Sequence, residues 1–128
     1  MHTVLIVDDS HGTLDLIERC VHRITKNTIT ALDGQSAWEL FQQQSPDLVI
    51  TDYKMPGING IELAQLIRTI NKDCPIILVT GYDDMDEAIM TQFKFKNIFP
   101  KPFPIERFQC AVKRLLGITG TAAKQAAT

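Results

Sequence analysis

Cysteine, histidine and long apolar runs are scarce in this sequence of 128 residues. The three cysteines are far apart and show no Cys-x-x-Cys spacing, so neither a disulfide framework nor a zinc site is predicted. The first apolar run, residues 4–7, is flanked at once by acidic residues and is too short for a signal peptide or a membrane span. We therefore expect a cytoplasmic protein that does not contact a membrane.

The sequence also lacks an excess of charge of one sign. Its 13 basic and 15 acidic residues give a formal net charge of -2, and the basic residues are scattered along the chain. Nucleic-acid binding depends on a basic surface that contacts phosphates. The chain is therefore not expected to bind nucleic acid directly.

What the sequence does contain is a strand-then-helix unit that occurs five times. Apolar runs of strand length alternate with segments whose apolar residues recur at helical spacing. The length and a hydrophobic content of 45% fit a single domain over residues 1–117, whereas the small, polar segment 118–128 reads as a linker or a disordered tail. The predicted strands cover residues 3–8, 28–32, 47–51, 76–80 and 97–100.

This alternation predicts an α/β fold in which helices cover both faces of one parallel, doubly wound, five-stranded sheet. The uninterrupted apolar character of residues 4–7 and 76–79 agrees, because a strand buried on both faces shows no alternation. Proline lacks the N–H that a central strand needs. Pro100 therefore places the fifth strand at an edge of the sheet.

Polar residues stand where the apolar runs stop. Asp8 and Asp9 follow the first run, and Asp52, Thr80 and Lys101 follow the third, fourth and fifth. The carboxyl ends of parallel strands lie along one edge, where open α/β folds bind their ligands. We expect these five side chains to form one site.

The chemistry of such a site follows from its charges. Carboxylates about 4 Å apart repel by roughly 4 kcal/mol at an effective dielectric near 20, so the cluster calls for a divalent cation. Mg²⁺ suits it, because this ion prefers oxygen ligands and is often completed by a phosphate oxygen. Asp52 stands apart from the acidic pair and is the candidate nucleophile toward a phosphoryl group. Thr80 and Lys101 would stabilise the charge that such a group brings.

Four motifs, in order, resemble the response-regulator receiver domains of two-component signalling. They are VLIVDDS at 4–10, PDLVITDYKMPG at 46–57, LVTG at 78–81 and KPF at 101–103. The resemblance spans residues 3 to about 116. It implies a flavodoxin-like (βα)5 fold with strand order 2-1-3-4-5 and a cis peptide bond between Lys101 and Pro102, a state otherwise found in about 5% of such bonds.

The resemblance also implies a mechanism and partners. A histidine kinase or a phosphotransfer protein would phosphorylate Asp52, while Asp8, Asp9, Asp52 and the backbone carbonyl of Lys54 would hold Mg²⁺. Thr80 and Lys101 would contact the phosphoryl group. Signalling would use the fourth helix, fifth strand and fifth helix to bind an effector or a second copy.

Three positions concern regulation. Receivers usually carry Tyr or Phe three residues before the lysine, but here Ile98 stands there, and its branched side chain is stiff. We therefore hypothesise that activation depends on the loop after Thr80 and the fourth helix. Lys54 and Tyr82 each lie two residues beyond a site residue, and either could tune the lifetime of an aspartyl phosphate or be a solvated loop side chain.

Three alternatives use related features. A haloacid-dehalogenase-like phosphohydrolase carries a second aspartate two residues after the nucleophile, where this chain has Lys54, so turnover of an external substrate is not expected. A flavodoxin-like electron carrier needs a Ser/Thr/Gly-rich phosphate loop where Asp8 and Asp9 would repel a flavin phosphate. A receiver that only docks, without phosphorylation, is the third alternative, which the complete set of acids disfavours.

Overall fold

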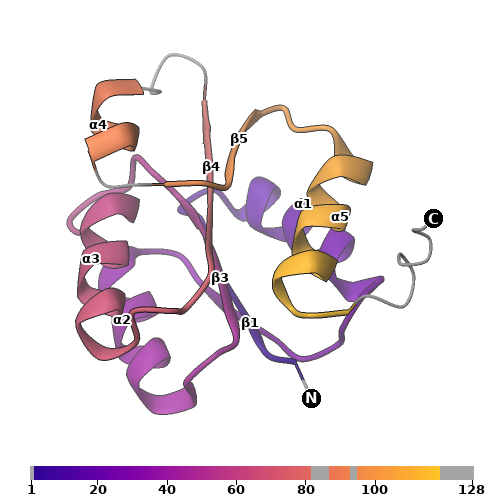
Figure 1. Cartoon of the computed structure of the whole chain (residues 1–128), viewed down its shortest axis with the longest axis horizontal. Helices are drawn as coiled ribbons and strands as arrows, with labels where there is room; N and C mark the ends of the chain where they lie inside the picture. The colour runs from indigo at the N-terminus through magenta and orange to yellow at the C-terminus, as the bar shows by residue number, and fades with distance from the viewer. Residues whose placement is uncertain (1, 82–86, 93–94, 119–128) are drawn as a thin grey trace.

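The computed structural model describes residues 2–81, 87–92 and 95–118, in which five strands alternate with five helices (Figure 1). Three predicted features lie outside these residues: the tail from residue 119 onward, Tyr82, and both ends of the fourth helix, which the sequence predicts at about residues 84 and 93. The strands are β1 Val4–Val7, β2 Thr28–Ala31, β3 Leu48–Asp52, β4 Ile76–Gly81 and β5 Ile98–Lys101. The helices are α1 His11–His22, α2 Gly34–Gln44, α3 Gly60–Ile70, α4 Glu87–Gln92 and α5 Ile105–Leu115.

The strands form one parallel sheet in the order β2-β1-β3-β4-β5, which confirms the predicted fold class and strand order. β5 is an edge strand, as Pro100 predicted, and Pro100 pairs with Thr80 in the register of β4 and β5. The register matters for the site because it sets Asp52 beside Val79 and Gly81 beside Lys101. The carboxyl ends of β3, β4 and β5 therefore reach the same edge.

Two hydrophobic clusters pack on opposite faces of the sheet. One joins α2 and α3 to alternate residues of the central strands, and the other joins α1 and α5 to the residues between them. Figure 1 shows the same arrangement, with α2 and α3 on one side and α1 and α5 on the other. Burial on both faces explains why β1, β3 and β4 read as continuous apolar runs. Within the described ranges, no helix has the length and apolar content to cross a membrane.

Several element bounds differ from those that the sequence predicts. Asp52 and Lys101 are the last residues of β3 and β5 rather than the first residues of loops, because the extended backbone continues past the apolar side chains. α2 begins at Gly34, three positions before its first predicted apolar residue, because the Asp33 side chain accepts a hydrogen bond from the Ser36 amide and caps the helix. Side-chain periodicity locates an element better than it locates the ends.

The start of α3 is held against the end of β3 by a close backbone approach. The Gly60 amide donates a hydrogen bond to the Tyr53 carbonyl oxygen at 2.8 Å. A Cβ atom on Gly60 would overlap the carbonyl oxygen of Asp52. Asn59 caps the helix through a reciprocal pair of hydrogen bonds with Glu62. The start of α3 therefore lies in close contact with the backbone of Asp52.

Substitution of Gly60 tests this contact. Gly60→Ala should lower the free energy of unfolding by about 2 kcal/mol or more, because backbone atoms of Asp52 would have to move. Gly12→Ala is the matched control, since a Cβ there meets only the Ser10 hydroxyl at 4.0 Å; it should raise stability by about 0.5 kcal/mol. Urea unfolding measures both, and equal effects of the two changes would contradict a tight approach at Gly60.

Candidate functional site

All five residues predicted from the strand ends meet at the carboxyl edge of the sheet. Asp8 and Asp9 directly follow β1, Asp52 ends β3, Thr80 lies next to the end of β4, and Lys101 ends β5. Asp8 is fully buried and Asp52 is 7% exposed, whereas Asp9 is exposed to solvent. Two buried carboxylates at the ends of neighbouring strands require compensating positive charge, part of which a single cation supplies.

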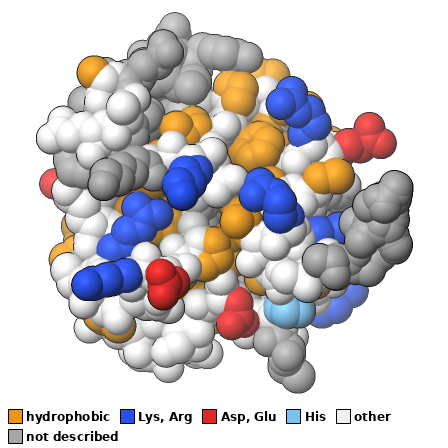
Figure 2. All heavy atoms as spheres, in the orientation of Figure 1, with side chains coloured by type: hydrophobic (Ala, Val, Ile, Leu, Met, Phe, Trp, Pro, Cys, Tyr) orange, Lys and Arg blue, Asp and Glu red, His pale blue; other side chains and the backbone are white. Residues whose placement is uncertain are grey.

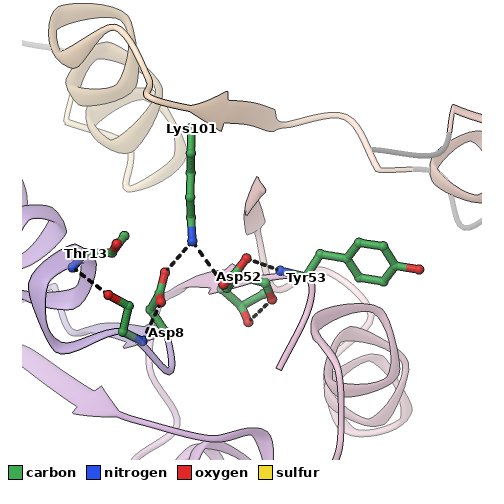
Figure 3. A network of polar contacts seen from close by, with 7 residues as sticks. Asp8, Thr13, Asp52, Tyr53 and Lys101 are labelled. Atoms are coloured by element: carbon green, nitrogen blue, oxygen red, sulfur yellow. Dashed lines mark hydrogen bonds and ion pairs between the residues drawn. The ribbon is translucent and has the colours of Figure 1, made fainter. Parts of the chain in front are cut away.

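Lys101 provides that compensation. Its ammonium nitrogen donates hydrogen bonds to Asp8 Oδ2 at 2.9 Å and to Asp52 Oδ2 at 3.0 Å. Figure 3 shows the long lysine side chain reaching from β5 to a point between the two carboxylates. Such charge-assisted hydrogen bonds are about twice as strong as neutral ones. The bridge ties the ends of three separate strand segments together.

Backbone amides orient the other oxygen of each carboxylate. Asp8 Oδ1 accepts a hydrogen bond from the Ser10 amide at 2.9 Å, and Asp52 Oδ1 accepts one from the Tyr53 amide at 2.8 Å (Figure 3). Ser10 also caps α1, since its hydroxyl accepts from the Thr13 amide. No sequence pattern predicts the role of the Tyr53 amide, whereas an N-cap serine just before an apolar helical pattern is a readable signal for Ser10.

The electrostatics of the site disfavour the ionised form of Asp52. Burial raises the pKa of the Asp52 carboxyl above its ordinary value; the hydrogen bond from Lys101 opposes this rise, and the Asp8 carboxylate adds to it. Burial alone would lower the pKa of Lys101, but its hydrogen bonds to Asp8 and Asp52 raise the pKa overall. One ammonium therefore does not fully compensate the acidic pocket.

The donor set fits a hard divalent cation. One carboxylate oxygen from each of Asp8, Asp9 and Asp52 lies within 4.8 Å of the other two. Oxygen-only donors converging on a partly exposed pocket match the preference of Mg²⁺, which also retains waters. Exposed Asp9 leaves one side of the cluster open to solvent. The residues at this edge can thus hold such an ion.

Thr80 is the fourth predicted residue, and its hydroxyl is unusual. Thr80 is fully buried, and its Oγ1 has no hydrogen-bond partner among the described residues. A buried polar atom left unpaired costs about 1–3 kcal/mol, so it marks a position where a partner is expected. Lys101, which borders the same edge, is followed by a cis peptide bond to Pro102, as the resemblance implied.

The positions linked to regulation lie around this pocket with different exposure. Lys54 is exposed, and its ammonium lies 5.5 Å from the centroid of the Tyr53 ring. Ile98 is half-buried and packs against the cluster that contains α2 and α3. The role of the Lys54 carbonyl as a metal ligand stays a prediction, as does that of Tyr82.

Comparisons with known proteins agree with this geometry. Sporulation initiation phosphotransferase F of Bacillus subtilis is 32% identical over 114 residues, which cover 88% of this chain and 92% of that protein. The probable transcriptional regulator ycf27 of Guillardia theta is 34% identical over 121 residues, which cover 94% of this chain but only 47% of the relative. The chain thus spans about half the length of some curated relatives.

A solved structure and a family model also match this chain over most of its length. The receiver domain of the Francisella response regulator 1452 superposes with a TM-score of 0.80 at 26% identity, over 93% of this chain and 99% of that one. The family model described as the response regulator receiver domain matches residues 4–113. This family is one of signalling domains rather than substrate-turnover enzymes, which removes the phosphohydrolase alternative. The chain belongs to the response regulator receiver domains of two-component systems.

Proposed function

We propose that this receiver accepts a phosphoryl group on Asp52 from a histidine kinase or a phosphotransfer protein. A carboxylate oxygen of Asp52 attacks the phosphorus atom, the P–N bond to the donor histidine breaks, and the bonding electron pair returns to the imidazole nitrogen. The observation that carries the proposal is the pairing of Asp52 with Lys101 at the same sheet edge as Thr80, whose hydroxyl has no partner among the described residues. The arriving phosphoryl oxygens would supply the partners that this edge lacks.

Lys101 and Thr80 would then change partners. The Lys101 ammonium, now shared by two carboxylates, would pair with a phosphoryl oxygen, and the Thr80 hydroxyl would donate to another. Thr80 would gain a hydrogen bond that it does not make within the described protein. This gain is the energetic reason for β4 to respond to phosphorylation.

Mg²⁺ is the proposed cofactor, held by Asp8, Asp9, Asp52 and the Lys54 carbonyl. When bound, the ion offsets the charge of the acidic cluster and of the phosphoryl oxygens. Asp8 would hold its place through the Ser10 amide, and Asp52 through the Tyr53 amide. Both carboxylates are thus oriented before the ion arrives.

The readout of phosphorylation would lie on α4, β5 and α5, where an effector or a second copy would bind. β5 connects this surface to the site, because it carries Lys101 at one end and Ile98 at the other. With Ile98 in place of the usual aromatic, we propose that β4 and the chain after it transmit the change. A receiver that only docks is the alternative that the next experiment excludes.

Phosphorylation of Asp52 can be measured by intact mass. Incubation with acetyl phosphate and Mg²⁺ should add one phosphoryl group to the wild-type protein and none to Asp52→Asn. Asp15→Asn is the matched control, because it makes the same chemical change at an exposed residue of α1 and should leave the gain intact. No mass gain in the folded wild-type protein would favour the docking alternative.

The decay of that added mass tests the role of Lys54. Lys54→Ala should shorten the lifetime of the phosphoryl group, because the exposed ammonium two residues from Asp52 would no longer obstruct an attacking water. Lys26→Ala, at an exposed residue between α1 and β2, is the control and should leave the lifetime unchanged. Equal lifetimes in all three proteins would make Lys54 a solvated loop residue.

Unfolding with and without Mg²⁺ tests the charge balance. At ten times its dissociation constant, Mg²⁺ should raise the free energy of unfolding of the wild-type protein by about 1.4 kcal/mol. Asp52→Asn should weaken this response yet be more stable than wild type without metal at neutral pH, because a neutral amide avoids the cost that raises the Asp52 pKa.

The pH dependence of stability follows from the direction of the Asp52 pKa shift. The cost of the ionised Asp52 is complete above its raised pKa and disappears as the pH falls through that pKa to below the ordinary value of 3.8. The advantage of Asp52→Asn should shrink over the same interval. A metal-free Asp52→Asn protein that is less stable than wild type at neutral pH would contradict this balance.

A further inference from the structure

A hollow of roughly 480 Å³ lies at the end of the sheet opposite the carboxylates. It is bordered by the end of α3, the first residue of β4, the residues just before β5 and the end of α5. Figure 2 shows one face of the molecule, on which Lys and Arg side chains lie on both sides of an apolar band. None of the residues assigned to the phosphoryl site lines this hollow.

The rim of the hollow is basic. Arg68, Lys72 and Lys96 line it together with a single acid, Asp73. Arg114 adds a fourth cation, since it donates a hydrogen bond at 3.1 Å to Asn97 of the lining. Among the ion pairs of the described residues, none involves these four cations. A chain with a net charge of -2 has therefore gathered positive charge on one face.

The floor of the hollow is apolar and uncharged. Ile76 and Cys74 are each 3% exposed, and Leu115 is half-buried. Burial raises the pKa of the Cys74 thiol to about 11, so this group stays neutral at physiological pH. Such a floor suits an apolar side chain and offers no donor array for a row of phosphates.

A second hollow, of roughly 350 Å³, continues the first along α3. Arg68 lines both hollows, and its guanidinium lies 5.6 Å from the centroid of the Phe95 ring. Ile61 and Ala64 add apolar lining to the second hollow. The two hollows thus form a groove with apolar pockets and Arg68 between them.

We propose that this groove binds an acidic peptide segment of a partner protein, with an apolar side chain on the floor and carboxylates on the rim. Charge complementarity identifies the partner, because unpaired cations attract carboxylates and an apolar floor favours a residue such as leucine. A second copy of this chain is a poor occupant, since a two-fold contact would bring the same cations together. Binding here does not depend on phosphorylation of Asp52.

The test uses the unphosphorylated protein and a short fluorescent peptide with glutamates on both sides of one leucine. Fluorescence anisotropy should show saturable binding that weakens with added salt. Lys72→Glu combined with Lys96→Glu should raise the dissociation constant about tenfold, because each exposed change replaces an attraction with a repulsion. Amide shifts in NMR spectra should cluster at Asn97, Leu115 and the end of α3.

Two controls separate this site from general charge effects. The double variant Lys26→Glu and Arg23→Glu makes the same change of net charge at exposed residues outside the groove, and should alter affinity by less than about twofold. A peptide with serine in place of leucine should bind more weakly. Absence of saturable binding, equal losses in both double variants, equal affinity for the serine peptide, or tighter binding of a single-stranded DNA of equal charge would each overturn the proposal.

Discussion

The bridge from Lys101 to Asp8 and Asp52 is the interaction on which the site depends. Three strands that are distant in sequence end together, and two of them bring carboxylates into a buried edge where mutual repulsion would otherwise force them apart. The ammonium at the end of β5 reduces the repulsion between the two carboxylates without removing it. The raised pKa of Asp52 records the remaining imbalance. A site held in this condition gains from added positive charge and from an anion that engages Lys101, which is why a metal ion and a phosphoryl group suit it.

The rest of the fold keeps that arrangement in place. The Ser10 and Tyr53 amides orient the carboxylates, and the close approach of Gly60 fixes the backbone behind Asp52. Thr80 is the exception, because its buried hydroxyl has no hydrogen-bond partner among the residues that the structure describes. In the proposed function, the arriving phosphoryl group would therefore act on β4 through this hydroxyl.

The two ends of the sheet carry opposite charge. Carboxylates collect at the carboxyl ends of the strands, whereas Arg68, Lys72 and Lys96 collect at the amino ends of β4 and β5. The small net charge of the sequence conceals this separation. Basic residues that are scattered along the chain become neighbours where the ends of α3 and α5, which pack on opposite faces, border the same end of the sheet. A basic surface can thus form from residues that are scattered along the chain, and its apolar floor offers no donor array for the phosphates of a nucleic acid.

The sequence by itself determined the fold class, the edge position of β5 and the residues at the strand ends. Buried parallel strands leave continuous apolar runs, amphipathic helices leave a periodic pattern, and proline cannot donate a hydrogen bond to a central strand. It also supplied the motifs from which the family, the strand order and the cis bond before Pro102 followed by resemblance. Only the tertiary structure decided that Asp52 and Lys101 end their strands, that Lys101 reaches both carboxylates, and that the Thr80 hydroxyl finds no partner within the described part of the chain. These facts depend on register and on distances between strands, and no local pattern encodes them. The same holds for the basic groove, whose four cations come from three separate segments that meet only in the folded chain.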